Sequence, residues 1–165
     1  MQKDDIQHAY SISDEKISIV PHFIKSYGQQ DTHDKEDRFV FIGRLGKQKQ
    51  VDHLIKSYNQ FLKYGHQTKL AIYGADEQNQ KQVILDLVKE YQIEDKVDLN
   101  DFTKHPLEEF KKSKASLLTS EYEGFGLTVM ESIEVGCPVI AYDVRYGPGE
   151  IIEHGKNGYL VEPDN

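Results

Sequence analysis

Short runs of β-branched and aromatic residues alternate along this chain with longer segments in which apolar residues recur every three or four positions. The strand-like runs cover 38–43, 69–74, 96–99, 115–120, 138–142 and 158–161. The helical patterns between them cover 51–62, 83–91, 106–113, 126–135 and 147–154. Because parallel neighbours need crossover connections, this alternation predicts a parallel sheet with helices on both faces. The expected fold class is α/β, a Rossmann-like three-layer sandwich.

Composition narrows the function classes. The chain has 165 residues, 38% of them apolar and 29% charged, which suits one folded domain. A formal net charge of −8 does not suit a nucleic-acid groove, so we expect no nucleic-acid partner. No apolar run is long enough for a membrane helix, and one cysteine suits a reducing compartment. We therefore expect no transmembrane segment and a cytoplasmic protein; the oligomeric state stays open.

Both ends of the chain look cut. Residues 1–16 are polar and weakly patterned, and SIVPHFI (18–24) resembles a segment that needs a neighbour. The chain stops soon after the strand pattern at 158–161. We expect an interdomain segment at 1–24 and a domain at 25–165 that lacks a preceding domain and its C-terminal helices.

Ligands of such sheets bind beyond the carboxyl ends of the strands, so the loops after residues 43, 74, 101 and 120 are expected at one rim. Arg44 follows the first strand, and Lys49 lies where the first helix begins. Two cations near a helix N-terminus suit an anion such as a nucleotide diphosphate. Two surface cations beside a loop would explain the same spacing.

The segment SEYEGFGLTVMES (120–132) places Glu123 on a loop and Glu131 inside the helix that follows. A carboxylate at the loop can accept hydrogen bonds from sugar hydroxyls, and one on the helix can accept them from a ribose diol. Gly124 and Gly126 flank Phe125 and allow a phosphate to approach the helix start. A loop carboxylate and a helix-face carboxylate without a ligand are the alternative.

The other rim loops carry weaker signals. In the turn after the second strand we favour Asp76 as the N-cap of the next helix. Phe102 suits either a place beside a nucleotide base or a hydrophobic plug. No zinc-ligand spacing occurs among the histidines and Cys137, so we expect no metal. Cys137 is expected to be buried, and His22 to be structural.

Together these segments resemble family-4 retaining glycosyltransferases of the GT-B architecture, over residues 18–165. The resemblance lies in FIGRLGKQKQVDHLI (41–55), EGFGLTVMES (123–132), GCPVIAYD (136–143) and GEIIEHGKNGYLVEPD (149–164). Within the family, YDVRYGPGEII (142–152) looks most like Gram-positive enzymes that glucosylate glycerol- or ribitol-phosphate wall polymers, or that glycosylate surface adhesins.

The resemblance implies the nucleotide-sugar-binding half of such an enzyme. The donor would be UDP-glucose or UDP-N-acetylglucosamine, and the acceptor a poly(glycerol-phosphate) teichoic acid or a surface glycoprotein, engaged through the preceding domain. It implies catalytic roles for Glu123, Arg44 and Lys49. The implied donor-binding residues are Gly43, Arg44, Lys49, Gly74, Phe102, Glu123, Gly124, Phe125, Gly126, Leu127 and Glu131. It implies no metal and no cofactor, because the UDP-sugar is a substrate.

Some positions depart from the family pattern. Gln50 and Asp101 stand where many relatives have glycine, and Gly74-Ala75-Asp76 replaces a G-x-G turn. We expect the isolated chain to be inactive, with the enzyme acting in the cytoplasm or at the inner face of the membrane. The alternatives are a non-catalytic nucleotide-sugar-binding or scaffolding module, a sugar-nucleotide epimerase of similar fold, and a flavodoxin-like domain.

Overall fold

The strands of this chain run parallel in one sheet, as their sequence pattern predicts. The structure is a computed structural model that describes residues 2–20, 22–24, 26 and 35–163. The sheet contains β1 (Arg38–Ile42), β2 (Lys69–Tyr73), β3 (Val97–Asn100), β4 (Ala115–Leu118), β5 (Val139–Tyr142) and β6 (Gly158–Val161). Their order is β3-β2-β1-β4-β5-β6, with every neighbouring pair parallel. The first strand, β1, therefore lies in the middle of the sheet, with β2 and β3 on one side of it and β4, β5 and β6 on the other.

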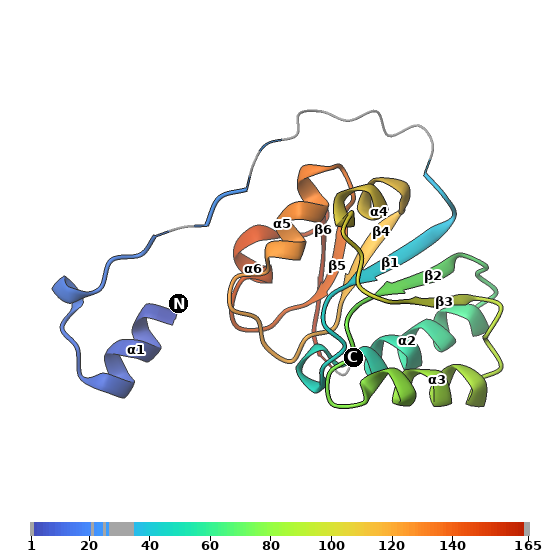
Figure 1. The fold of residues 1–165 in the computed structure, drawn as a ribbon. Coiled ribbons are helices and arrows are strands. Elements are labelled where there is room, and N and C mark those ends of the chain that lie inside the picture. Colours follow the sequence, from blue (N-terminus) through green and yellow to red (C-terminus); the bar gives the residue numbers. More distant parts are fainter. Residues whose placement is uncertain (1, 21, 25, 27–34, 164–165) are drawn as a thin grey trace.

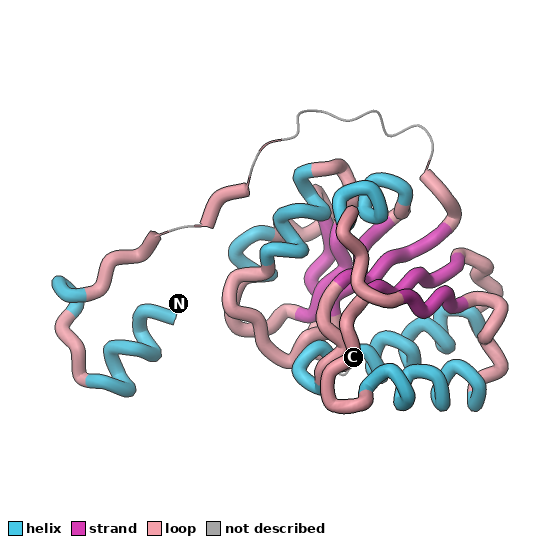
Figure 2. Tube along the Cα trace, viewed as in Figure 1, coloured by secondary structure: helices cyan, strands magenta, loops and turns pink. Residues whose placement is uncertain are grey.

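Helices cover the two faces of the sheet and complete the three layers (Figure 1). One face carries α2 (Val51–Lys63) and α3 (Gln80–Glu90). The other carries α4 (Pro106–Lys112), α5 (Leu127–Glu134) and α6 (Pro148–Ile151). The tube in Figure 2 shows the same separation, with the strands between the two groups of helices. The predicted α/β three-layer sandwich is confirmed.

Successive side chains of β1 point to opposite faces of the sheet, so this strand contributes to a hydrophobic core on each face. Phe41 is fully buried and packs with residues of α2 and α3, among them Ile55 and Ile84. Its neighbour Val40 points to the opposite face and packs in the cluster that contains Phe110 of α4. Side chains of successive strand residues point to opposite faces, so an apolar run buried on both sides is what a central parallel strand needs.

The N-terminal residues form a helix that the sequence pattern does not predict. The helix α1 (Gln2–Tyr10) is short and polar, with Ile6 partly exposed. Figure 1 draws it away from the sheet. Of the interdomain segment predicted at 1–24, positions 1 and 21 lie outside the described residues, as do 25, 27–34 and 164–165 of the domain predicted at 25–165.

Two helix boundaries and one cap differ from the prediction. Helix α3 begins at Gln80, before the apolar pattern at 83, and α6 ends at Ile151, before 154. The N-cap of α3 is Asn79, so the prediction of Asp76 at that position is wrong. The Asp76 carboxylate nevertheless accepts a hydrogen bond from the Lys81 amide at 2.9 Å. A side chain from outside the helix thus satisfies one of its free N–H groups.

Candidate functional site

Two adjoining clefts open where β1, β2 and β4 end. The first rim cleft, of about 560 Å³, has polar and apolar walls from the loops after β1, β2 and β3 and from α5. It is lined by Ile42, Gly43, Arg44, Tyr73, Gly74, Ala75, Phe102, Thr103, Lys104, Pro106, Thr128 and Glu131. The second rim cleft, of about 380 Å³, is lined by Arg44, Gly46, Lys47, Gln48, Lys49, Glu77, Gln78, Glu121 and Tyr122. Arg44 borders both clefts, at the edge predicted for ligand binding.

Gly74 allows the first two loops to meet at this rim. A Cβ added at Gly74 would lie 2.0 Å from the carbonyl oxygen of Gly43 and 3.0 Å from the side chain of Leu45. The first of these distances is far inside van der Waals contact. The two predicted glycines, 43 and 74, therefore face each other, and the close approach of their backbones forms one wall of the first rim cleft.

Lys49 and Glu123, predicted to bind different parts of a donor, bind each other in this structure. The Lys49 ammonium donates to Glu123 Oε1 at 2.6 Å, and the Ser120 hydroxyl donates to the same oxygen at 2.6 Å. Lys49 belongs to a single 3₁₀ turn, Lys47–Lys49, directly before α2. Thr119, at the end of β4, fixes that turn by donating to the carbonyls of Lys49 and Gln50. Ser120 and Thr119 are site residues that the sequence analysis missed.

The loop that carries Glu123 is hydrogen-bonded to a neighbouring loop on each of its two sides. On one side the Glu121 amide donates to the Gln48 carbonyl at 2.9 Å, and the Gln48 side chain donates to the Tyr122 carbonyl. On the other side the Glu123 amide donates to the Arg145 carbonyl at 3.1 Å, and the Tyr146 amide donates to the Glu123 carbonyl at 2.9 Å. The loops after β1 and β5 thus hold the loop after β4 in one conformation.

The N-terminal residues touch the same group of loops. The ring of His22 lies 4.9 Å from the ring of Phe125 between centroids, tilted by 46°. The Tyr146 hydroxyl donates to the Asp5 carboxylate of α1 at 2.5 Å. These are packing and hydrogen-bonding contacts between the first residues of the chain and the rim. The His22 contact fits the structural role predicted for it.

Helix α5 leaves this loop through a turn that favours glycine. Gly126 has φ of +89°, a conformation that side-chain-bearing residues rarely adopt, and Leu127 begins the helix. Glu131 lies one turn further on and lines the first rim cleft. Burial raises the pKa of its carboxyl group. Glu123 and the four residues after it, Gly124–Leu127, line neither rim cleft, whereas Thr128 lines the first.

Arg44 is paired with an acid that the sequence analysis did not include. Its Nη1 lies 3.1 Å from Glu77 Oε1 of the loop after β2. The Arg44 side chain is 69% exposed and the Glu77 side chain 43% exposed. The guanidinium is therefore open to a ligand from both clefts, with a carboxylate already beside it.

Phe102 lies at the open mouth of the first rim cleft. It is 70% exposed, so it fills no hydrophobic core in this structure. The preceding residue, Asp101, is tied to Lys81 of α3 at 2.7 Å. Across the cleft, Tyr73 donates from its hydroxyl to Glu109 at 3.0 Å, and Arg38 donates to the same carboxylate oxygen at 2.7 Å. The exposed ring and the anchored tyrosine line the cleft together with the apolar side chains of Ile42, Ala75 and Pro106.

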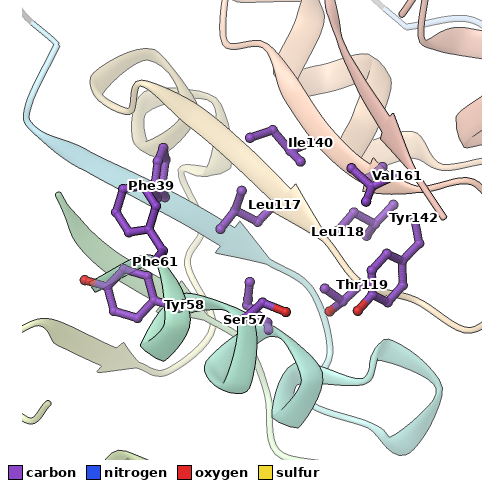
Figure 3. Close-up of a pocket in the computed structure, with 12 residues that line it drawn as sticks. Phe39, Ser57, Tyr58, Phe61, Leu117, Leu118, Thr119, Ile140, Tyr142 and Val161 are labelled. Atoms are coloured by element: carbon purple, nitrogen blue, oxygen red, sulfur yellow. The ribbon is translucent and has the colours of Figure 1, made fainter. Parts of the chain in front are cut away.

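A third hollow, on the α2 side of the sheet, lacks the chemistry for an anion. Its volume is about 290 Å³, and Figure 3 shows aromatic and aliphatic side chains around it. It is lined by Phe39, Leu54, Ser57, Tyr58, Phe61, Leu117, Leu118, Thr119, Ile140, Ala141, Tyr142 and Val161. No charged side chain is among these residues, so a diphosphate would meet no cation there.

Within residues 2–20, 22–24, 26 and 35–163, no group of three histidine, cysteine or acidic side chains is arranged to hold a metal ion. Across the same described part of the chain, no helix is long and apolar enough to cross a membrane. Cys137 is fully buried, as predicted, and burial raises the pKa of its thiol.

Sequence comparison relates this chain to enzymes that transfer sugars. The family described as Glycosyl transferases group 1 matches residues 24–165. The chain is 36% identical over 126 residues to the poly(glycerol-phosphate) alpha-glucosyltransferase of Bacillus subtilis, covering 76% of this chain and 18% of that protein. It is 32% identical over 164 residues to the poly(ribitol-phosphate) alpha-N-acetylglucosaminyltransferase of Staphylococcus aureus, covering 99% and 32%. The chain thus spans a third or less of these two relatives.

Solved structures have the same fold. A crystal structure of an S. aureus TarM mutant in complex with fondaparinux, alpha-GlcNAc-glycerol and UDP superposes with a TM-score of 0.89 at 31% identity, covering 99% of this chain and 32% of that one. The pneumococcal O-GlcNAc transferase GtfA in complex with UDP and GlcNAc gives 0.84 at 28% identity, covering 99% and 33%. Both similarities extend over nearly the whole of this chain.

Proposed function

Because this chain belongs to the group 1 glycosyl transferases, we propose that it binds the donor of a retaining glycosyltransferase, UDP-glucose or UDP-N-acetylglucosamine, in its two rim clefts. The observation that carries this proposal is the shared position of Arg44 between the clefts. The first cleft has Glu131 and the exposed Phe102 for a nucleoside, and the second has Lys47 and Lys49 for phosphates. A diphosphate beside Arg44 would join these two halves.

In this proposal each half of the donor has its own partners. The uracil lies beside Phe102, and the ribose hydroxyls donate to Glu131. Arg44 makes forked contacts to the diphosphate, and Lys49 supplies a point charge. The amides at Gly124–Leu127 line neither rim cleft, and we propose that they approach the phosphate from the start of α5 when the donor binds. Glu123 accepts hydrogen bonds from the donor sugar through the carboxylate oxygen that Lys49 and Ser120 do not use.

The proposed chemistry is stabilisation of a leaving group. The bond between the sugar and the diphosphate breaks while the acceptor oxygen arrives on the same face of the ring. Negative charge builds on the departing phosphate, and preorganised cations and amides lower the energy of that state. Losing one such donor raises the barrier by about 3 kcal/mol. Glu123 positions the sugar in this scheme and does not attack it.

The acceptor would be bound outside this chain. The relatives named above suggest a poly(glycerol-phosphate) or poly(ribitol-phosphate) chain. A surface glycoprotein is the other acceptor that we propose, and either would be bound by a domain that precedes these residues. We therefore propose that the 165-residue chain by itself binds donor and transfers no sugar. We also propose that the enzyme acts in the cytoplasm, at the inner face of the membrane.

Calorimetric titration of the chain with UDP tests the site. We expect binding, and we expect Arg44→Ala and Glu131→Ala each to weaken it roughly tenfold, since each removes a charged hydrogen-bond partner. Lys156→Ala is the matched control, because Lys156 pairs with Glu153 on the surface and lines neither rim cleft. Equal affinities in all four proteins would refute the proposed site.

A donor screen of the longer protein tests the reaction. UDP release from UDP-glucose or UDP-N-acetylglucosamine should require a teichoic acid or a serine-rich peptide as acceptor. Release of UDP only with acceptor, and of none by the 165-residue chain, agrees with the proposal. An epimerised sugar nucleotide as product, or UDP binding without any turnover, contradicts it.

A further inference from the structure

The loop after β2 places a carboxylate against the arginine that both rim clefts share. Glu77 Oε1 accepts from Arg44 Nη1 at 3.1 Å. Glu77 itself lines the second rim cleft together with Arg44 and Lys49. An incoming diphosphate would therefore meet a guanidinium that already has an anionic partner.

Backbone contacts hold Glu77 in this place. The Leu45 amide donates to the Ala75 carbonyl at 2.8 Å, and the Glu77 amide donates to the Leu45 carbonyl at 3.0 Å. These two bonds continue the pairing of β1 and β2 beyond the strands, with a bridge between Leu45 and Asp76. Glu77 Oε2 also lies 3.0 Å from the position that a Cβ on Gly46 would occupy. The carboxylate thus lies over the loop that carries Arg44.

We propose that Glu77 is a positioning residue that holds Arg44 at the rim when the site is empty and competes with the diphosphate for it. The proposal rests on the function proposed above. A ligand phosphate that accepts from Arg44 Nη1 replaces Glu77 there, and the displaced carboxylate stays nearby as a like charge. Glu77 consequently weakens the binding of the nucleotide and speeds its release. It does so through Arg44 alone, without changing other contacts of the site.

The size of the effect follows from the exposure of the pair. Both side chains are accessible, so solvent screens their attraction. Exposed ion pairs of this kind shift an equilibrium by about two- to fivefold. The Lys49–Glu123 pair differs, because its side chains are far less exposed and its carboxylate also accepts from Ser120. Competition is therefore expected at Arg44 and not at Lys49.

The test is UDP titration of four substituted chains beside the unsubstituted one: two single substitutions of glutamate, Arg44→Gln, and a double substitution. Glu77→Gln keeps an oxygen that can accept from Arg44 but removes the charge. Glu153→Gln makes the same change in net charge at a surface pair with Lys156, outside both rim clefts. The double substitution combines Glu77→Gln with Arg44→Gln and is compared with Arg44→Gln alone.

We expect Glu77→Gln to bind UDP about two- to fivefold more tightly than the unsubstituted chain. Its dissociation rate constant should fall by the same factor. The gain should shrink between about 20 mM and about 300 mM salt, because salt screens exposed charges. Glu153→Gln should leave the affinity unchanged. When Arg44 is already glutamine, Glu77→Gln should give little further gain.

Unchanged or weaker UDP binding by Glu77→Gln overturns the proposal, as does an equal gain in Glu153→Gln. An equal gain without Arg44 also overturns it, since Glu77 would then act by direct repulsion alone. Failure of the unsubstituted chain to bind UDP is a different outcome. It removes the proposed function itself, so the two failures are distinguishable.

Discussion

The Lys49 ammonium lies 2.6 Å from Glu123 Oε1, and both side chains are largely covered, at 15% and 10% exposure. Each of the two is proposed to contact a different part of the donor. In this structure they neutralise each other, and the Ser120 hydroxyl donates to the same carboxylate oxygen. A charge removed from water at this depth needs such a partner, because its desolvation is otherwise uncompensated.

Removing one member of this pair should therefore destabilise the fold. We expect Lys49→Met to lower the free energy of unfolding by about 2–3 kcal/mol, somewhat less than for a fully buried pair. Urea denaturation measures it. Lys56→Met is the control, because Lys56 pairs with Asp52 on an exposed helix turn and should cost under about 0.5 kcal/mol. Adding Glu123→Gln to Lys49→Met should restore part of the loss; equal costs for the two lysines would contradict this account.

We expect the carboxyl group of Glu131 to make nucleotide binding depend on pH. Burial raises its pKa from the usual 4.5, so the folded protein holds this proton to higher pH than the unfolded chain does. Its stabilising contribution is complete below 4.5 and is lost as pH rises through the raised value. Ionisation gives the proposed contact to the ribose hydroxyls a charged and therefore stronger acceptor, so UDP affinity should rise over the same window.

Calorimetry from about pH 5 to about pH 7.5 checks this, with Glu131→Gln as the reference that cannot ionise. The advantage of the unsubstituted chain over Glu131→Gln should grow with pH to roughly tenfold. Because both proteins meet the same UDP, the ligand's own titration cancels. Parallel pH profiles in the two proteins would show that Glu131 is not the group involved.

The Glu109 carboxylate on α4 should stabilise the fold above its titration range. Burial raises its pKa, but hydrogen bonds from Arg38 and Tyr73 and the charge of Arg38 outweigh burial, and the net pKa is lowered from 4.5. A lowered carboxyl pKa contributes stability above 4.5 that is lost as pH falls through the folded value. We expect Glu109→Gln to cost about 1–2 kcal/mol at pH 7 and progressively less below pH 4.5.

The neighbouring Glu108 provides the control for this experiment, since it pairs with Lys111 and is mostly exposed. Glu108→Gln should change the unfolding free energy by less than about 0.5 kcal/mol, both at pH 7 and below pH 4.5. Tyr73 lines the first rim cleft, so Glu109→Gln should also weaken UDP binding modestly. A pH-independent cost for Glu109→Gln would argue against an ionic role.

Gly74 should tolerate no side chain. The added Cβ of Gly74→Ala would overlap the Gly43 carbonyl oxygen at 2.0 Å, and backbone cannot move aside as a flexible side chain can. We expect a loss of at least about 3 kcal/mol, or no folded protein, read from thermal unfolding. Gly65→Ala is the comparison, because its Cβ would meet nothing within 4 Å and only its positive φ is strained. A Gly74→Ala protein as stable as Gly65→Ala would show that the two loops separate freely.

The sheet and its helices were predictable because local apolar patterns determine them. Phe41 and Val40 alternate between two cores, and Ile55 recurs at helical spacing. Helix α1 was missed because its residues are mostly polar and give no apolar stripe. The early start of α3 was missed because Asp76 supplies its bond from outside the helix, which spacing does not reveal.

The places of Arg44, Lys49 and Glu131 at the rim clefts were predictable, but the partners of their side chains were not. Arg44, Lys49 and Glu131 follow strands or begin helices, so sequence order alone assigns them to one rim. Their pairing depends on which loops meet in space. Glu77 approaches Arg44 only because the loops after β1 and β2 continue the sheet pairing, and Ser120 reaches Glu123 only through the turn after β4.

The hydrogen bonds on both sides of the loop after β4 have a thermodynamic consequence for any ligand held by Glu123. Gln48 on one side and Arg145 and Tyr146 on the other fix the backbone without a ligand. Conformational entropy that a mobile loop would lose during association has here been lost already when the chain folded. Association with a sugar nucleotide should consequently proceed without an ordering step at this loop, and its rate should be set by encounter and by the exchange of partners at the cations.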